Sequence, residues 1–254
     1  MPYTVAAGRR LEYEWIEGRA ERPALVFLHE GLGSLRQWRD FPARAAVETG
    51  CPALVYSRYG YGDSDVLEEP RVPLTYMHDE AKRALPELLA GLGIARPVLV
   101  GHSDGASIAL IHAGAGHPVR GLALMAPHVF VEDISIESIR RARGDFETTD
   151  LPERLAKYHR DPAKTFHLWN DAWLDPEFRQ WNIEEYLPRI SCPVLAIQGE
   201  DDEYGTLAQV RAVAAQVAGR CEVLTLAQCG HRVHIDQPGR ALAAISRFVD
   251  ELRR

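Results

Sequence analysis

Short, continuous apolar runs recur along the chain, and they do not alternate with polar residues. The runs cover residues 24–28, 53–56, 98–100, 122–125 and 194–197. Strands that are covered on both faces of a parallel sheet have this pattern. Helical stretches lie between the runs, such as residues 77–92 and 208–217, and a final one covers residues 240–252. The alternation predicts an α/β fold with a doubly wound, mostly parallel sheet.

The alternation is interrupted between residues 127 and 192. This interval is rich in aromatic and charged residues at helical spacing. We therefore expect residues 1–127 and 192–254 to form the core and residues 128–191 to form an inserted helical cap. Because α/β sheets bind ligands beyond the carboxyl ends of their strands, the cap is expected over that edge. The alternative is a helical excursion that packs elsewhere on the core.

Charge and composition narrow the classes of partner. The chain of 254 residues has 36 acidic and 29 basic residues, a formal charge of −7 and no conspicuous block of Lys and Arg. Neither nucleic acid nor an anionic membrane is therefore an expected partner. No signal-peptide pattern opens the chain, and no apolar run approaches the roughly 18 residues of a membrane span, which indicates a soluble, cytoplasmic protein. The four cysteines and ten histidines show no metal-site spacing, so we expect reduced thiols and no metal.

The most informative motif is Gly101-His102-Ser103-Asp104-Gly105, which fits GxSxG. An apolar, β-branched run precedes it and a helix-forming stretch follows it. This context predicts a nucleophile elbow, in which a sharp turn lifts the Ser103 hydroxyl out of the sheet. The turn also directs the first N–H groups of the following helix to the place where an oxyanion would form.

A serine hydroxyl needs an imidazole base and a carboxylate that orients the base. The apolar run at 194–197 leads into an acidic cluster, in which Asp201 and Asp202 are the candidates. His231 follows the next apolar stretch, and His234 is the local alternative base. The order along the chain is therefore serine, acid, histidine, with each residue near the end of a predicted strand.

Taken together, these motifs resemble the α/β-hydrolase fold, in particular the carboxylesterase and meta-cleavage hydrolase superfamily, over nearly the full chain. The resemblance is carried by residues 29–34, Gly60-Tyr61-Gly62-Asp63-Ser64, the elbow, Gly199-Glu200-Asp201-Asp202, Gly230-His231 and Gln237-Pro238. It implies that Asp202 is the acid, because the acid of this family usually lies three residues after the strand-ending glycine. It also implies an oxyanion hole formed by the backbone N–H groups of Gly31 and Asp104, and no cofactor.

The chain departs from the family pattern at the proposed oxyanion loop. Glu30 occupies a position where the family usually has glycine, and Ser57 and Tyr59 stand where it often has Asp and Arg. Because a glutamate lacks the backbone freedom of glycine, the path of the loop is an open question. The nucleophile is serine rather than aspartate, which argues against haloalkane dehalogenase chemistry.

The resulting hypothesis is a serine hydrolase that cleaves a small-molecule carboxylic ester through an acyl-enzyme. Alternatives with the same triad are a C–C bond hydrolase, a lactonase and an amide hydrolase, and a receptor-like binding protein is the non-catalytic alternative. We expect the substrate pocket to include His128, Trp169, Trp173 and Trp181. The Asp104 side chain either points away from the site as a helix-start residue or pairs with a cationic substrate, as its GxSDG resemblance to valacyclovirase-type esterases suggests.

Overall fold

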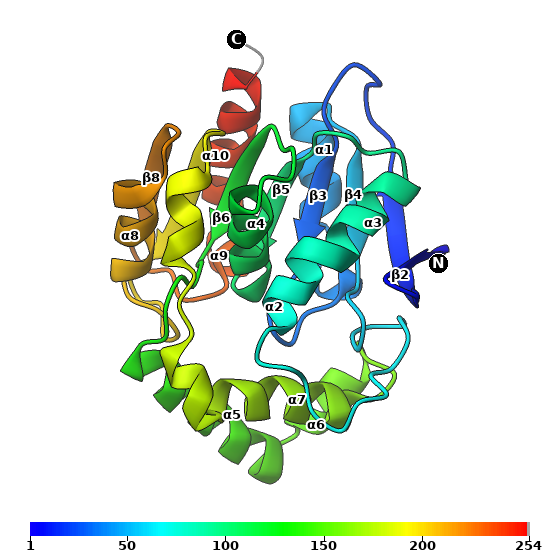
Figure 1. The fold of residues 1–254 in the computed structure, drawn as a ribbon, viewed down its shortest axis with the longest axis vertical. Coiled ribbons are helices and arrows are strands. Elements are labelled where there is room, and N and C mark those ends of the chain that lie inside the picture. Colours follow the sequence, from blue (N-terminus) through cyan, green and yellow to red (C-terminus); the bar gives the residue numbers. More distant parts are fainter. Residues whose placement is uncertain (253–254) are drawn as a thin grey trace.

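The computed structural model describes residues 1–252 and has one eight-stranded sheet with helices on both faces (Figure 1). The strands are β1 Tyr3–Ala6, β2 Arg9–Ile16, β3 Leu25–Leu28, β4 Ala53–Tyr56, β5 Val98–His102, β6 Gly121–Met125, β7 Val194–Gly199 and β8 Cys221–Leu226. Their order across the sheet is β1-β2-β4-β3-β5-β6-β7-β8. Strands β1 and β2 pair antiparallel, β2 joins β4 antiparallel, and all other pairs are parallel. The predicted doubly wound, mostly parallel sheet is confirmed.

Two helical layers cover this sheet. The α-helices are α1 Phe41–Thr49, α2 Tyr76–Asp79, α3 Leu85–Gly91, α4 Asp104–Gly114, α5 Asp133–Thr148, α6 Leu151–Ala156, α7 Pro162–Leu174, α8 Ala208–Gln216, α9 Val233–Asp236 and α10 Pro238–Glu251. Short 3-10 turns are η1 Leu35–Trp38, η3 Pro176–Gln180 and η4 Glu184–Arg189. Alternate residues of β5 enter different cores, since Leu99 packs on the α4 side and Val98 and Val100 pack on the α1 and α10 side. Burial on both faces explains the continuous apolar runs.

The helix expected over residues 77–92 is divided. A π-helical turn, η2 Glu80–Ala84, separates α2 from α3. Pro86 lies in the first turn of α3, where it cannot donate a backbone hydrogen bond and where its ring crowds the carbonyl four residues earlier. A widened turn just before the proline accommodates this crowding.

The segment between β6 and β7 is helical and contributes no strand to the sheet. Figure 1 shows α5, α6 and α7 lying across one edge of the sheet. This is the carboxyl edge, because two residues of the helical segment bond to the loop that follows β4. Thr165 of α7 donates to the Gly60 carbonyl at 2.7 Å, and the N–H of Arg160, between α6 and α7, donates to the Gly62 carbonyl at 3.0 Å. The end of the segment, η4, instead packs beside the sheet against α4 and α8. None of the helices in residues 1–252 is long and apolar enough to cross a bilayer.

Candidate active site

Ser103 occupies a sharp turn between β5 and α4, with φ 52° and ψ −119°. A positive φ is unfavourable for serine and requires support from the surrounding structure. That support comes from the close approach of strand and helix, which glycines permit: a Cβ on Gly105 would lie 2.0 Å from the Leu28 carbonyl oxygen, and one on Gly101 would lie 2.5 Å from the Gly105 oxygen. The local structure therefore has the strand, turn and helix of a nucleophile elbow.

Asp202 and His231 meet at the ends of β7 and β8. The His231 Nδ1 lies 2.9 Å and 3.0 Å from the two Asp202 carboxylate oxygens. The carboxylate is itself held by the Gln198 amide at 2.6 Å and by the Tyr204 N–H at 2.8 Å. With Nδ1–H donating to Asp202, the Nε2 atom of His231 is left as the proton acceptor. This is the arrangement of an oriented general base.

The neighbouring candidates do not take part in this pair. Asp201 is exposed, and its N–H donates to the Cys229 carbonyl at 3.0 Å. His234 lies on α9 and packs its ring against Trp38, with the ring centroids 4.8 Å apart. The structure thus places Asp202, and not Asp201, beside His231.

Mutual attraction shifts the pKa values of the pair. Burial raises the pKa of Asp202, but the charge and hydrogen bond of His231 outweigh burial, and the net pKa is lowered. Burial lowers the pKa of His231, but the Asp202 carboxylate outweighs it, and the net pKa is raised. The site therefore favours a protonated imidazole more than water does, as is required of a base that must take up a proton during the reaction.

The elbow and the histidine loop are joined by His102, the residue before Ser103. Its Nε2 lies 2.9 Å from the His231 carbonyl oxygen, and its Nδ1 lies 3.4 Å from the Glu30 carboxylate. This buried imidazole brings together three segments that are far apart in the sequence. Its position under the elbow is structural, since no atom of it lies at the surface.

The path of the Glu30 loop is fixed by its carbonyl group. The Glu30 oxygen accepts from His29 Nδ1 at 2.8 Å, from the Arg58 guanidinium at 2.9 Å and from the Gly33 N–H at 3.1 Å. The peptide between Glu30 and Gly31 is trans, so its N–H points opposite to this anchored oxygen. Burial holds the pKa of His29 well below its usual range, which leaves a neutral ring whose Nε2 accepts the Arg58 N–H at 3.1 Å.

Gly31 and Asp104 supply the two backbone groups that the resemblance assigns to an oxyanion hole. Within residues 1–252, neither N–H donates to another protein group. The indole of Trp169 lies directly against Gly31, because a Cβ there would be 2.0 Å from the Trp169 Nε1. Only glycine fits below this indole, so the sequence and the packing agree at this position.

The Asp104 carboxylate is buried and already engaged. It accepts from the Tyr76 hydroxyl at 2.6 Å, and the same hydroxyl accepts from the Trp173 indole N–H at 3.0 Å. Burial raises the pKa of Asp104, although the Arg58 charge and the Tyr76 hydrogen bond oppose this. The side chain is therefore neither solvated nor unpartnered, and through Tyr76 it links α4 to helix α7.

The other aromatic residues expected at the pocket gather beside His231. The His128 ring lies 5.7 Å from the His231 ring and 5.2 Å from the Trp173 ring, measured between centroids. Trp173 and Trp181 are 6.1 Å apart. All of these residues are at most 8% exposed. The structure thus brings the predicted pocket residues to the same edge of the sheet as the Asp202–His231 pair.

Several residues at the site have no counterpart in the sequence-based prediction. Arg58 contacts the oxyanion loop and Tyr76 contacts Asp104. Gln198 holds Asp202, and the exposed Glu203 accepts the His231 N–H at 3.1 Å. A signal exists only for Arg58: it is a charged residue two positions after the buried strand β4, where α/β folds place functional side chains.

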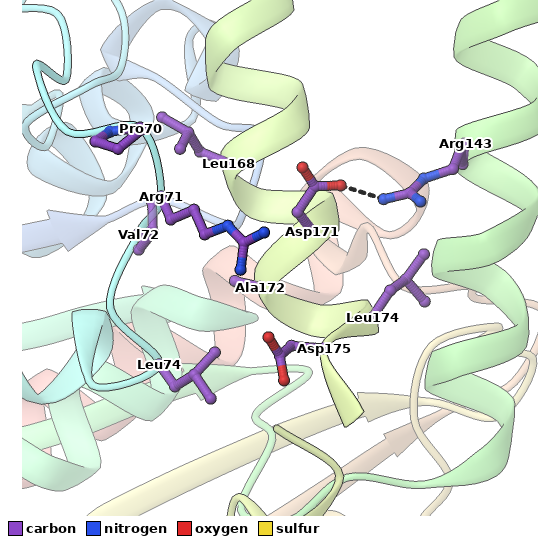
Figure 2. Close-up of a pocket in the computed structure, with 10 residues that line it drawn as sticks. All are labelled: Pro70, Arg71, Val72, Leu74, Arg143, Leu168, Asp171, Ala172, Leu174 and Asp175. Carbon is purple, nitrogen blue, oxygen red and sulfur yellow. Dashed lines mark hydrogen bonds and ion pairs between the residues drawn. The ribbon is translucent and has the colours of Figure 1, made fainter. Parts of the chain in front are cut away.

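Two cavities are lined by the segment that follows β4. Figure 2 shows one of about 220 Å³ between the 70–74 loop and α7, where Arg71 points towards Asp171 and Asp175, and it is not lined by any of the residues discussed above. The other, of about 410 Å³, lies between the N-terminal hairpin and the segment after β4, and Arg58 and Tyr76 are among its lining residues. No group of three or more His, Cys, Asp or Glu side chains within residues 1–252 is arranged to hold a metal ion.

Comparison with known proteins gives the family. The chain is 24% identical over 260 residues to the 2-succinyl-6-hydroxy-2,4-cyclohexadiene-1-carboxylate synthase of Serratia proteamaculans, covering 92% of this chain and 95% of that protein. It is 24% identical over 284 residues to the proline iminopeptidase of Lactobacillus helveticus, covering 96% and 95%. A carboxylesterase structure from Nitrososphaera gargenis superposes with a TM-score of 0.80 at 19% identity, over 99% of each chain. The model of the alpha/beta hydrolase family matches residues 25–245, and the chain therefore belongs to that family.

Proposed function

We propose that the protein is a serine hydrolase that cleaves a small carboxylic ester through an acyl-enzyme. The observation that carries this proposal is the hydrogen-bonded Asp202–His231 pair, whose histidine contacts His102, the residue before the strained turn at Ser103. The three residues occupy the carboxyl ends of β5, β7 and β8, where α/β folds place their chemistry. No cofactor is required for this reaction.

Acylation begins when the Ser103 Oγ attacks the ester carbonyl carbon and His231 Nε2 takes the hydroxyl proton. Asp202 keeps the imidazole in the tautomer with Nδ1 protonated and stabilises the imidazolium. The carbonyl oxygen becomes an oxyanion, which accepts from the N–H groups of Gly31 and Asp104. When the intermediate collapses, the bond to the alcohol oxygen breaks and His231 returns the proton to that oxygen.

Deacylation repeats these steps with water as the nucleophile. His231 takes a proton from water, the hydroxide attacks the acyl carbon, and the intermediate releases the carboxylic acid while Ser103 recovers its proton. Trp169, Trp173, Trp181 and His128 provide apolar walls for the substrate, since aromatic side chains offer a large contact area with few rotatable bonds. Trp169 lies directly against Gly31 of the oxyanion loop.

Amide hydrolysis is the second candidate, because a proline iminopeptidase is among the relatives of similar length. Hydrolysis of a C–C bond or a lactone would use the same triad. A receptor-like, non-catalytic protein would not need an oriented base beside the elbow serine. The retained Asp202–His231 pair therefore favours an enzyme over a binding protein.

Turnover of p-nitrophenyl acetate by the wild type and by Ser103→Ala tests the proposal. We expect the substitution to lower kcat by about 10⁴- to 10⁶-fold, with little further loss when His231→Ala is added, because triad members act as a unit. A fluorophosphonate should label Ser103 alone, as mass spectrometry of the labelled peptide would show. Proline p-nitroanilide serves as the amide comparison. Full turnover by Ser103→Ala would contradict the proposal.

We also propose that the enzyme works in the cytoplasm. Support comes from Cys192, Cys221 and Cys229, which are free thiols in the described structure. Burial raises the pKa of Cys192 and Cys221 to about 11, so neither is activated towards oxidation. A location where thiols stay reduced is compatible with this set.

A further inference from the structure

A cavity of about 320 Å³ lies at the seam between the cap and the core, and we call it the seam cavity. On the cap side it is lined by α6 and the residues after it, including Lys157. On the core side it is lined by Glu30, by η1 with Gln37 and the adjoining Arg39, and by α9 with the preceding Arg232. It therefore adjoins both the oxyanion loop and the residue that follows His231.

The seam cavity is basic, although the chain as a whole has a formal charge of −7. Arg39, Arg154, Lys157 and Arg232 line it, against the single carboxylate of Glu30. Arg154 pairs with Asp150 at 3.1 Å, whereas Arg39, Lys157 and Arg232 form no ion pair within residues 1–252. Three exposed cations without acidic partners surround one small opening, which favours an anion there.

Two residues that line the cavity each have a buried polar atom without a partner in the described chain. These atoms are the Oε1 of Gln37 and the Nδ1 of His234. His234 is only 5% exposed, and burial lowers its pKa to about 3, so its ring is neutral and one of its nitrogens carries a proton to donate. Buried polar groups are normally hydrogen-bonded, so these atoms point to a ligand or to water that satisfies them.

A row of imidazole rings places the seam cavity on the His231 side of the candidate site. The His234 ring lies 4.8 Å from the His102 ring, and the His102 ring lies 5.0 Å from the His231 ring. In the proposed reaction His231 gives its proton to the departing alcohol, so the leaving group lies on the His231 side of Ser103. Asp104, Tyr76 and Trp173 occupy a different part of the site.

From the unpaired cations, the unpartnered His234 and the place of the cavity beside His231, we infer that the seam cavity binds an anionic group, a carboxylate or a phosphate, on the leaving-group half of the substrate. The inference rests on the proposed hydrolase function. Arg39, Lys157 and Arg232 hold the anion at the rim, and the neutral His234 donates to it or to the group that joins it to the ester. Glu30, whose carboxylate lies 3.4 Å from the His102 Nδ1, adjoins Gly31 and repels the anion from the oxyanion loop.

Matched esters test the charge preference. Phenyl acetate, 4-acetoxybenzoate and 4-acetoxyphenyl phosphate share one acyl group and differ in the charge of the leaving group. We expect wild-type kcat/KM to be about tenfold or more higher for at least one anionic ester, because partly exposed cations still attract an anion at low ionic strength. The ester with the larger preference identifies the anion as carboxylate or phosphate. A wild-type preference below about twofold for both would overturn the inference.

Paired variants locate the preference in the seam cavity. Lys157→Gln/Arg232→Gln should bring the ratio of anionic to neutral kcat/KM to within about threefold of unity. The control Arg140→Gln/Arg189→Gln removes the same charge from two exposed residues that do not line the cavity, and it should keep the wild-type ratio. Equal loss in both double variants would show a general charge effect and contradict the assignment.

A direct measurement separates this inference from the proposed function. Calorimetry with the Ser103→Ala protein would record the binding of 4-hydroxybenzoate and of phenyl phosphate without turnover. If Ser103→Ala binds an anion and the protein that also carries Lys157→Gln and Arg232→Gln does not, the seam cavity is the anion site, even if no ester is hydrolysed. Absence of binding of both anions at millimolar concentration, together with turnover of phenyl acetate by the wild type, would leave the hydrolase standing and reject the anion site.

Discussion

Arg58 offers the sharpest test of the oxyanion loop. Its guanidinium donates to the Glu30 carbonyl at 2.9 Å, and that bond helps to orient the next N–H, on Gly31, towards the proposed oxyanion. Arg58→Lys keeps a charge near Asp104 but loses the planar, forked donor, and Arg58→Gln loses both. Neither change touches Ser103, Asp202 or His231. A fall in activity would therefore result from a change in the position of the oxyanion loop.

The geometry sets the expected magnitude. Three groups hold the Glu30 carbonyl, and the His29 and Gly33 bonds at 2.8 Å and 3.1 Å survive the substitution. Removing an oxyanion-hole donor outright costs about 10²- to 10³-fold in kcat. A hydrogen bond from a charged donor contributes about 1.5–3 kcal/mol, which corresponds to roughly 10- to 100-fold in rate. We expect about 100-fold for Arg58→Gln and about tenfold for Arg58→Lys.

The assay is steady-state hydrolysis of p-nitrophenyl acetate, with kcat and KM determined separately. A lost transition-state contact lowers kcat and leaves KM nearly unchanged. Because Arg58 is buried, the free energy of unfolding is measured alongside, and only folded variants are compared. Arg36→Gln, an exposed neighbour paired with Asp63 at 3.5 Å, is the matched control. Wild-type kcat in folded Arg58→Gln would refute the role assigned to this side chain.

Four further expectations concern the same site. Asp202→Asn should lower kcat by about 10³- to 10⁴-fold and Asp201→Asn by less than about tenfold, and the reverse ranking would make Asp201 the acid. Because the pKa of His231 is raised and the base acts only when neutral, kcat/KM should fall as pH drops through a midpoint above 6.5, and Asp202→Asn should move that midpoint to lower pH. Substituting Trp169, Trp173 or Trp181 by Ala should change the kcat/KM ratio between short and bulky acyl esters, and an unaltered ratio in all three would make these residues structural. Since Tyr76 already occupies the Asp104 carboxylate, Asp104→Asn should leave the preference between an amino-acid ester and its uncharged isostere within about twofold, whereas a tenfold loss would reveal cation binding.

The sheet could be predicted from sequence because its signals are local. A strand buried on both faces needs a continuous apolar run, and the elbow needs glycines on both sides of Ser103, so both leave a pattern within a few residues. The break in the helix expected over residues 77–92 is harder to predict. Pro86 indicates that a helix is disturbed there, but it does not indicate that the turn before it is π-helical. The family model confirms the resemblance that these motifs carry.

The supports of the site could not be predicted, because they are contacts between distant segments. The bond from Arg58 to Glu30 joins the loops after β4 and β3, and the bond from Tyr76 to Asp104 depends on where α2 lies against α4. Because Glu30 stands where the family usually has glycine, the sequence did not predict the backbone path of the oxyanion loop. The structure accommodates this residue because Glu30 is not among the residues with a positive φ, so this position does not require glycine.

The distribution of the indoles makes the native protein its own optical reporter. Three of the five tryptophans, at positions 169, 173 and 181, are buried in the helical segment over the sheet edge, while Trp38 is buried in the core and Trp15 is 38% exposed on β2. Their emission depends on local polarity, so an apolar group that displaces water there would change both its wavelength and intensity, against the unvarying contribution of Trp15. Occupancy of the proposed substrate pocket can thus be followed by intrinsic fluorescence, without a label and without a chromogenic substrate.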